Sequence, residues 1–277
     1  MAGTSRIHAH GWRLLRVGVT VAVLGAVGFI LPEGVWDAMV CAVSSERCHD
    51  RGLAHLGTRG PRDTERGKRL MSRACDGGHA PACFHLGRVL QTGQTGPPQR
   101  AMAQGLYDQA CEAGHAMACT HLGMMRERGE VSPVDLRAAR RLYQRACDAD
   151  EPVACAHLGV LHSRGEGGVV DLAMARRLYD KACRGEVVKG CHNQGVMVDR
   201  GDGGPADKPR ARSLYRKACE GAHKLGCHNL AVMVDRGEGG PRDQAGARSL
   251  YARACHLGHG PSCEVVSPGY REVSRPR

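Results

Sequence analysis

The chain's most reactive side chains are fourteen cysteines, and twelve of them lie on a regular lattice. Along this lattice, pairs recur every 36 residues, and the two cysteines of a pair lie eight residues apart. The six pairs are Cys75 and Cys83, Cys111 and Cys119, Cys147 and Cys155, Cys183 and Cys191, Cys219 and Cys227, and Cys255 and Cys263. The remaining two, Cys41 and Cys48, are seven residues apart. Paired cysteines form disulfides or hold a structural zinc ion.

The spacing favours disulfides over zinc. On one straight helix, cysteines eight residues apart would be separated by about 12 Å, which is too far for a bond. If one cysteine ends a helix and the next begins an antiparallel helix, their Cα atoms come within about 5.5–6 Å, as a disulfide requires. Structural zinc, the alternative, prefers CxxC pairs, and the sequence contains none. We therefore expect an oxidising, extracytoplasmic compartment and no metal or other cofactor.

A second row of polar residues could bind a ligand, because one stands two residues after each second cysteine of five pairs. The row consists of His85, His121, His157, Asn193 and Asn229. We interpret these residues as hydrogen-bonding groups that hold neighbouring helices or a bound peptide. The alternative is that stacked histidines ligate haem or a metal. Four further histidines fall in predicted short turns, where we expect them to face solvent: His79, His115, His223 and His259.

Catalytic motifs are absent from the sequence. The serine β-lactamase pattern S-x-x-K does not occur, and its nearest matches, at Ser213 and Ser249, lack the lysine. No K-T-G, P-loop or dinucleotide fingerprint is present. The closely spaced His8 and His10 precede a hydrophobic run, on the side expected to be cytoplasmic. We therefore expect a protein that binds a partner and performs no reaction.

The elements that position these residues are predicted to be helices in pairs. In one repeat the segment 152–164 reads as a helix that Gly165 ends, and Asp171 is placed to cap a second helix ending near Gly185. Tyrosine, alanine, glycine and aspartate recur with the same 36-residue period. Neither helix can bury its apolar side alone, so neighbouring pairs must stack. Because only 4% of residues are aromatic, we expect close packing of small side chains.

These features together resemble a known repeat family. The unit C-x-x-L-G, a glycine-rich loop with Asp, and A-x-x-L-Y-x-x-A-C-x-x-G is similar to the SLR (Sel-one-like) repeat, a relative of the tetratricopeptide repeat. The cysteine pair in each unit resembles the Helicobacter cysteine-rich proteins. The resemblance covers about residues 48–263 and implies an exported, all-α, right-handed α-solenoid of 36-residue helix-turn-helix repeats with disulfide-locked helix pairs.

The resemblance also carries two functional expectations. The helices with the L-G motif line the concave face in this family, which would place the His and Asn row there as a surface for a protein or peptide. Some members have been described as penicillin-binding proteins or β-lactamases, and such an activity is the alternative function. The sequence does not identify the partner.

The N-terminal segment predicts export. Three arginines precede an uncharged run at 17–31, which is short for a membrane span and suits a signal peptide. We favour an uncleaved anchor, because Trp12 and Trp36 bracket the run as interfacial aromatics do. The nearest cleavage site would also remove Cys41 and leave Cys48 unpaired. A cleaved signal peptide remains the alternative, and in both cases the array lies outside the cytoplasm.

The expected domain organisation follows from these boundaries. It comprises a basic N-region (1–16), the apolar segment (17–31), a linker with the start of a degraded first repeat (32–47), the repeat array (48–263) and a tail (264–277). Pro268 and Gly269 deny a full helix after the last cysteine. Atypical terminal repeats are expected because they must cap the stack.

Net charge is +11, and arginines cluster on the second predicted helix of each pair. The simpler interpretation is a solvated convex face. The alternative is attraction to an anionic component of the cell envelope, such as lipid headgroups, a polymer or acidic peptide tails. We do not expect nucleic acid as a partner, because the compartment is wrong and no aromatic stacking platform is present.

Overall fold

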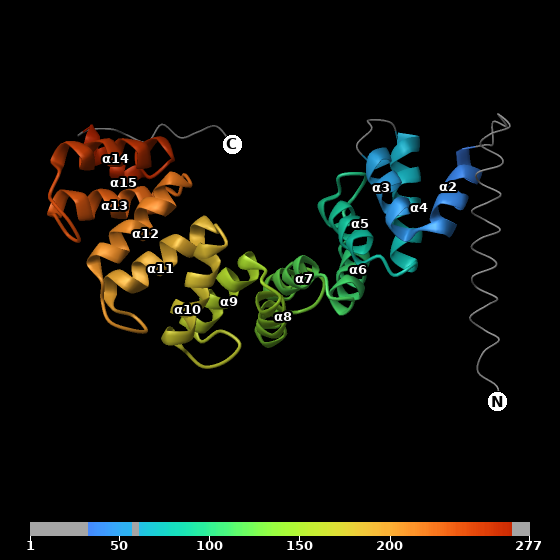
Figure 1. The fold of residues 1–277 in the computed structure, drawn as a ribbon, viewed down its shortest axis with the longest axis horizontal. Helices are drawn as coiled ribbons and strands as arrows, with labels where there is room; N and C mark the ends of the chain where they lie inside the picture. The colour runs from blue at the N-terminus through green and yellow to red at the C-terminus, as the bar shows by residue number, and fades with distance from the viewer. Residues whose placement is uncertain (1–32, 57–60, 268–277) are drawn as a thin grey trace. The chain divides into compact units, whose positions relative to one another are not determined.

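The computed structural model describes residues 33–56 and 61–267, and within these ranges the chain forms fourteen helices and no strand. Figure 1 shows them as successive short rods joined alternately by short turns and longer loops. The helices are α2 (Glu33–Val43), α3 (Ser45–Leu56), α4 (Pro61–Asp76), α5 (Ala80–Thr92), α6 (Arg100–Glu112), α7 (Ala116–Arg128), α8 (Leu136–Asp148), α9 (Pro152–Arg164), α10 (Leu172–Arg184), α11 (Val188–Arg200), α12 (Lys208–Glu220), α13 (Lys224–Arg236), α14 (Gln244–His256) and α15 (Gly260–Val266).

The helix bounds follow the signals in the sequence. Gly165 adopts a left-handed conformation, with φ of 71°, and ends α9 as predicted. The side chain of Asp171 then accepts a hydrogen bond from the backbone N–H of Met174 at 2.8 Å and caps α10. These two events recur along the array, so each repeat is a first helix, a glycine-rich loop and a second helix. The predicted all-α helix-turn-helix repeat is confirmed.

All fourteen cysteines form seven disulfides, with the pairing expected from their spacing. Their Cα atoms lie 4.4–4.8 Å apart, closer than the expected 5.5–6 Å, because the turn between the helices is short. In the six lattice pairs, each bridge joins the last turn of a second helix to the first turn of the next first helix. The disulfides therefore link successive repeats, and the glycine-rich loop within a repeat has no covalent bridge.

The chain divides into two compact units, unit 1 (1–122) and unit 2 (123–277). In both, the tyrosine of the second helix packs flat on a glycine of the first helix in the same repeat. A Cβ atom at Gly87 in unit 1 would lie 2.8 Å from the Tyr107 ring, and one at Gly159 in unit 2 would lie 2.7 Å from the Tyr179 ring. This contact explains the L-G motif, because any larger residue would separate the two helices.

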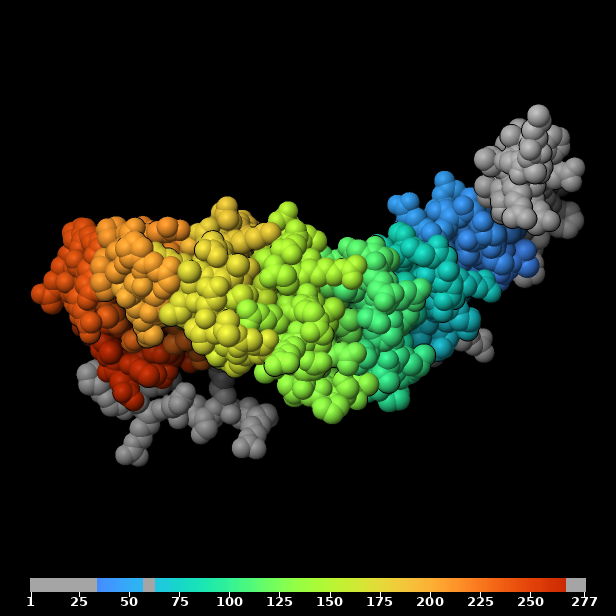
Figure 2. Space-filling model, turned by 90° about the horizontal axis from the view of Figure 1, so that it is seen from below, coloured from blue at the N-terminus to red at the C-terminus, as the bar shows by residue number. Residues whose placement is uncertain are grey.

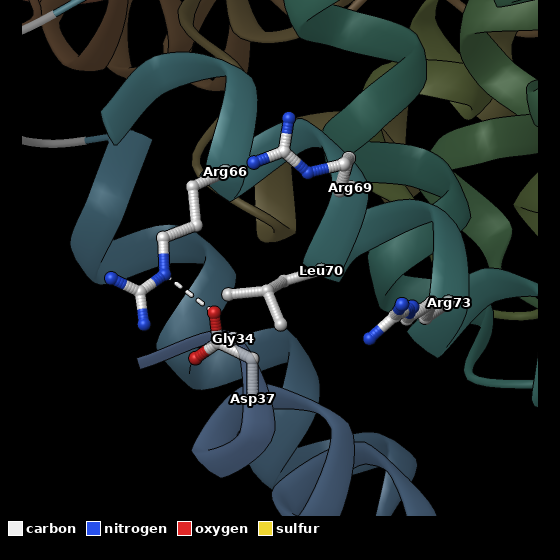
Figure 3. Close-up of a pocket in the computed structure, with 6 residues that line it drawn as sticks. All are labelled: Gly34, Asp37, Arg66, Arg69, Leu70 and Arg73. Carbon is white, nitrogen blue, oxygen red and sulfur yellow. Dashed lines mark hydrogen bonds and ion pairs between the residues drawn. The ribbon is translucent and has the colours of Figure 1, made fainter. Parts of the chain in front are cut away.

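At residues 33–43 the structure has a helix, α2, within the segment 32–47 that was expected to hold a linker and the start of a degraded first repeat. Asp37 of α2 is 5% exposed and accepts hydrogen bonds from Arg51 Nε at 2.7 Å and Arg66 Nε at 2.5 Å, as Figure 3 shows for Arg66. Burial alone would raise the pKa of Asp37, but the bonds from Arg66 and Arg51 outweigh it and hold the pKa below its ordinary value. This buried ion pair and the Cys41–Cys48 bridge attach α2 to the array.

The last helix of the array is shorter than the helices in its middle. The last helix, α15, has seven residues and ends at Val266, where the N–H of Ser267 bonds to the carbonyl of Cys263. The apolar segment 17–31 and the residues Pro268 and Gly269 lie outside the described residues. Within the described ranges no helix is long and apolar enough to cross a membrane.

Candidate interaction surface

The row of five His and Asn residues predicted to bind a ligand, called the ladder below, occupies one position of the repeat. This position lies in the first half of the first helix. Each ladder residue is half-buried. They are His85 on α5, His121 on α7, His157 on α9, Asn193 on α11 and Asn229 on α13. Their contacts differ between the two units and are described separately.

In unit 1 the ladder is built from stacked aromatic rings. His85 stacks on His49, with ring centroids 5.3 Å apart and planes 29° apart. His121 lies 5.3 Å from the ring of Tyr107 and 5.3 Å from that of Phe84. Burial lowers the pKa of His85, and the neighbouring His49 adds to this effect. His85 and His121 therefore act as packing groups in this unit.

In unit 2 the first ladder residue joins a charged network. His157 stacks on Tyr143, with centroids 5.0 Å apart, and its Nδ1 lies 3.5 Å from the Glu127 carboxylate. Tyr143 donates its hydroxyl proton to the same carboxylate at 2.5 Å. The bond to His157, and then that to Tyr143, hold the pKa of Glu127 below its ordinary value. Burial and then the Glu127 carboxylate raise the pKa of Tyr143 far above its usual range.

The two asparagines continue the row with hydrogen bonds. Asn229 Nδ2 lies 3.3 Å from His192 Nε2, and Asn193 Oδ1 lies 3.2 Å from His192 Nδ1. These partners fix His192 as the tautomer that donates from Nδ1 and accepts at Nε2. Asn193 also bonds to Tyr179, and Asn229 bonds to Tyr215. His192 therefore connects α11 to α13.

His121, His157, Asn193 and Asn229 each contact the tyrosine of the preceding repeat. The row thus holds neighbouring helices together, which is one of the two roles expected from the sequence. A peptide could reach the exposed part of the row. The His157 side chain, for example, is 33% exposed. Peptide binding at the row stays a prediction.

The turn histidines do not face solvent, contrary to the expectation from the sequence. They are half-buried, and each ring packs on a ring that follows the second cysteine of the preceding cysteine pair. The ring-centroid separations are 4.8 Å for His79 with His49, 4.6 Å for His115 with Phe84, 4.6 Å for His223 with His192, and 4.4 Å for His259 with His228. The short turn folds its last residue back over the previous first helix, which is why these side chains are covered.

Around the ladder, unit 2 presents a repeated stripe on α9, α11 and α13. Valines lie three residues after each ladder position and are half-buried, and exposed arginines follow one turn later. Near the start of α9 and of α13, Val153 is 40% exposed and Leu225 is 39% exposed. We call this stripe the first-helix surface; its residues are Val153, His157, Val160, Arg164, Asn193, Val196, Arg200, Leu225, Asn229, Val232 and Arg236. Figure 2 shows the repeats of unit 2 as successive bands of colour from green to red.

The sequence did not reveal the tyrosine partners. A polar residue sixteen positions earlier bonds to the hydroxyl of three tyrosines: Tyr107 donates to Gln91 at 2.9 Å, Tyr143 donates to Glu127, and the hydroxyls of Ser163 and Tyr179 are 3.5 Å apart. The tyrosine period was visible, but no single residue type marks the partner position. A search for any polar residue at that spacing would have found it.

The chemistry of the site is that of contact and hydrogen bonding. Across the described residues, no group of three or more His, Cys, Asp or Glu side chains could hold a metal ion. The hydroxyls of Ser213 and Ser249 donate to carbonyls of their own helices, Arg210 and Ala245. His8 and His10 lie outside the described residues. None of these observations supports the β-lactamase alternative.

Comparisons with known proteins agree with this architecture. The family model of the Sel1 repeat matches residues 43–79, 80–115, 116–151, 152–186, 188–223 and 224–259. Among solved structures, c5321, a protective antigen of uropathogenic Escherichia coli with an SLR fold, is 25% identical with a TM-score of 0.76. The alignment covers 80% of this chain and 48% of that one, so the chain spans about half of that protein.

Two further structures are similar. A Sel1 repeat protein from Oxalobacter formigenes is 21% identical with a TM-score of 0.67, over 78% of this chain and 86% of that one. Cysteine-rich protein B of Helicobacter pylori is 26% identical with a TM-score of 0.40, over 50% of this chain and 98% of that one. No curated protein matches the sequence.

Proposed function

Because the chain belongs to the Sel1-repeat family, we propose that it is an exported scaffold that binds a protein or peptide in the cell envelope through its first-helix surface. The repeat array is a protein-interaction fold. In such arrays, repetition of one helix position along neighbouring units creates an extended surface rather than a closed pocket.

Export is supported by the cysteines. Seven disulfides persist only in an oxidising compartment, and all fourteen cysteines are used. We propose the periplasm or the cell surface as that compartment, with the apolar segment 17–31 as the export signal or anchor. Thiol alkylation of the protein taken from cells, before and after reduction, tests this proposal, and free cysteines before reduction would contradict it.

The first-helix surface is the observation that carries the binding proposal. It combines amide and imidazole groups, which can bond to a peptide backbone, with partly exposed valines and a leucine that can bury side chains. The disulfides between repeats keep the first helices in register. A surface that is ordered before binding loses less conformational entropy when a partner docks.

Site-specific photo-crosslinking in the source cells tests the surface. A photoreactive amino acid replaces Leu225, which is exposed on α13, and in a matched control it replaces Arg216, which is exposed on the second helix α12. We expect a defined protein product from position 225 and none from position 216. The same yield from both positions, or none from position 225, would contradict the proposal.

With the crosslinked partner identified, its affinity measures the contribution of the row. The double variant Asn193→Ala, Asn229→Ala should weaken capture about tenfold, because two side-chain hydrogen bonds are removed. Circular dichroism would establish that the variant is folded. Unchanged capture by a folded variant would assign the two asparagines to helix packing alone.

A further inference from the structure

A pocket of about 540 Å³ lies on the other side of the repeat, between the second helices α10 and α12 of unit 2. Gln194 of α11 forms part of its wall, and the backbone at 203–205 forms another part. The ladder residues take no part in it. The lining residues are Ala173, Arg176, Arg177, Asp180, Arg184, Gln194, Gly203, Gly204, Pro205 and Arg210.

The pocket is strongly basic, because four arginines and one aspartate line it. The aspartate is already engaged: Asp180 accepts a hydrogen bond from Gln194, and its carboxylate lies 3.1 Å from Arg184 Nε and 3.0 Å from Arg210 Nη2. One negative charge therefore faces two guanidinium groups. It has no remaining capacity to neutralise the other two arginines.

Those two arginines lack an anionic partner among the described residues. Arg176 donates from Nη2 to the carbonyl of Pro205 at 2.9 Å, whereas its Nη1 is buried and has no hydrogen-bond partner. Arg177 is exposed, and its Nη2 lies 3.7 Å from the sulfur of Met174. A buried N–H of a charged group without a partner is uncommon in folded proteins. A negatively charged ligand in the pocket would be attracted by both guanidinium groups and could bond directly to the exposed Arg177.

Unit 1 shows which anion such arginines accept. There the carboxylate of Asp37 bonds to Arg66, in a pocket of about 290 Å³ that Arg69 also lines, as Figure 3 shows. In the repeat register, Arg210 lies four periods of 36 residues after Arg66, and Arg177 lies three periods after Arg69. Arg210 therefore binds the carboxylate of Asp180 as Arg66 binds that of Asp37, whereas Arg177 lines its pocket without a carboxylate partner among the described residues.

We propose that the α10–α12 pocket binds carboxylate side chains of an acidic peptide segment in a partner protein. The inference rests on the proposed function of the chain as a scaffold and gives it a second contact surface with a defined chemistry. Planar guanidinium groups bind carboxylates through paired hydrogen bonds, and clusters of arginine recognise acidic motifs in this way.

Fluorescence anisotropy with the full-length oxidised protein tests the proposal. The probe is a labelled peptide of alternating glutamate and glycine with blocked ends, and its control replaces every glutamate by glutamine. Arg177→Gln removes an exposed guanidinium from the pocket. The matched variant Arg141→Gln removes the same charge one repeat earlier, at an exposed position of α8 outside the pocket.

We expect the glutamate peptide to bind and the glutamine peptide to bind at least about tenfold more weakly. Arg177→Gln should weaken binding about tenfold, while Arg141→Gln should change it about twofold or less. Equal effects of the two variants would overturn the proposal, because they would show attraction to net charge alone. Displacement of the peptide by an equal concentration of inorganic phosphate would overturn it in favour of a phosphate site.

A second variant guards against an indirect effect. Arg176→Gln should also weaken binding. Thermal unfolding would show whether loss of the Arg176 bond to the loop at 203–205 destabilises the protein. Crosslinking from position 225 is independent of both variants. Failure of the acidic peptide to bind would therefore leave the first-helix surface as the separately tested proposal.

Discussion

The two kinds of junction between helices are built in opposite ways. Each short turn between repeats is closed by a disulfide, whereas three of the long loops within repeats are held by backbone packing. In three loops of unit 2 the second glycine rests on the preceding repeat, so that a Cβ atom at Gly167, Gly203 or Gly239 would lie only 2.2–2.4 Å from a backbone oxygen of that repeat's second helix. One junction therefore depends on a covalent bond, and the other depends on the absence of a side chain.

This difference shows how a repeat of small residues keeps its register. The long loop must approach the previous repeat closely, and Gly203 does so at a φ of 69°, a conformation that other residues rarely adopt. The second helix under two of these loops also supplies an arginine to a loop carbonyl. For example, Gly239 contacts α12, and Arg212 of α12 donates to Pro241 at 3.1 Å. The disulfide at the short turn and the packing of the long loop thus both join a repeat to the repeat before it.

The largest expected effect comes from breaking all the covalent junctions. In the six lattice pairs each bridge closes a nine-residue ring, whose removal costs about 2.5 kcal/mol in the chain-entropy model. Reduction by a phosphine should therefore remove most or all of the helical signal at 37 °C, as circular dichroism would show. A reduced protein that keeps its oxidised melting temperature would mean that the long loops alone maintain the stack.

A smaller effect is expected from a single long loop. Gly203→Ala adds a Cβ atom 2.2 Å from the carbonyl oxygen of Leu172 at a left-handed backbone position. The substitution should lower the free energy of unfolding by about 3 kcal/mol, as measured by urea denaturation. The control is Gly105→Ala, on the second helix α6, where a Cβ atom would meet nothing within 4 Å. Equal stability of the two variants would contradict the packing role of the loop.

The smallest expected effect is a pH dependence at a short turn. Burial, followed by electrostatic repulsion from His192, Lys189 and Lys224, lowers the pKa of His223 to about 4, from 6.5 in a model peptide. The unfolded chain then binds the proton more readily. The contribution of His223 to stability is therefore full above pH 6.5 and is lost as the pH falls towards 4.

Melting temperatures between pH 7.5 and 4 would measure this effect. The variant His223→Asn keeps a side chain that can cap α13 and removes the titrating ring, so its melting temperature should fall less on acidification. His256→Asn, at an exposed position of α14, provides the control. Identical pH profiles of the wild type and His223→Asn would show that the turn histidine does not contribute.

The sequence predicted the parts of the fold that depend on local signals. Gly165 and Asp171 located the ends of α9 and α10, and the cysteine period located the turns. The half-buried turn histidines were not predicted, since their partners lie about thirty residues earlier, on the preceding first helix. The helix α2 was missed because it precedes the periodic region and is attached by the contacts of Asp37. The basic pocket was not predicted either, because Arg177 and Arg210 come from different repeats and only the fold brings them together.

The position of the disulfides also determines how the bonds can form. In each of the six lattice pairs the partner lies eight residues away, whereas the next unrelated cysteine, for example Cys111 after Cys83, is 28 residues away. Closing the shorter segment costs less entropy. For a chain that emerges from its N-terminus into an oxidant, the nearest unpaired cysteine is therefore always the native partner. If the chain is exported as proposed, oxidation in order of emergence would therefore favour the native set of bridges.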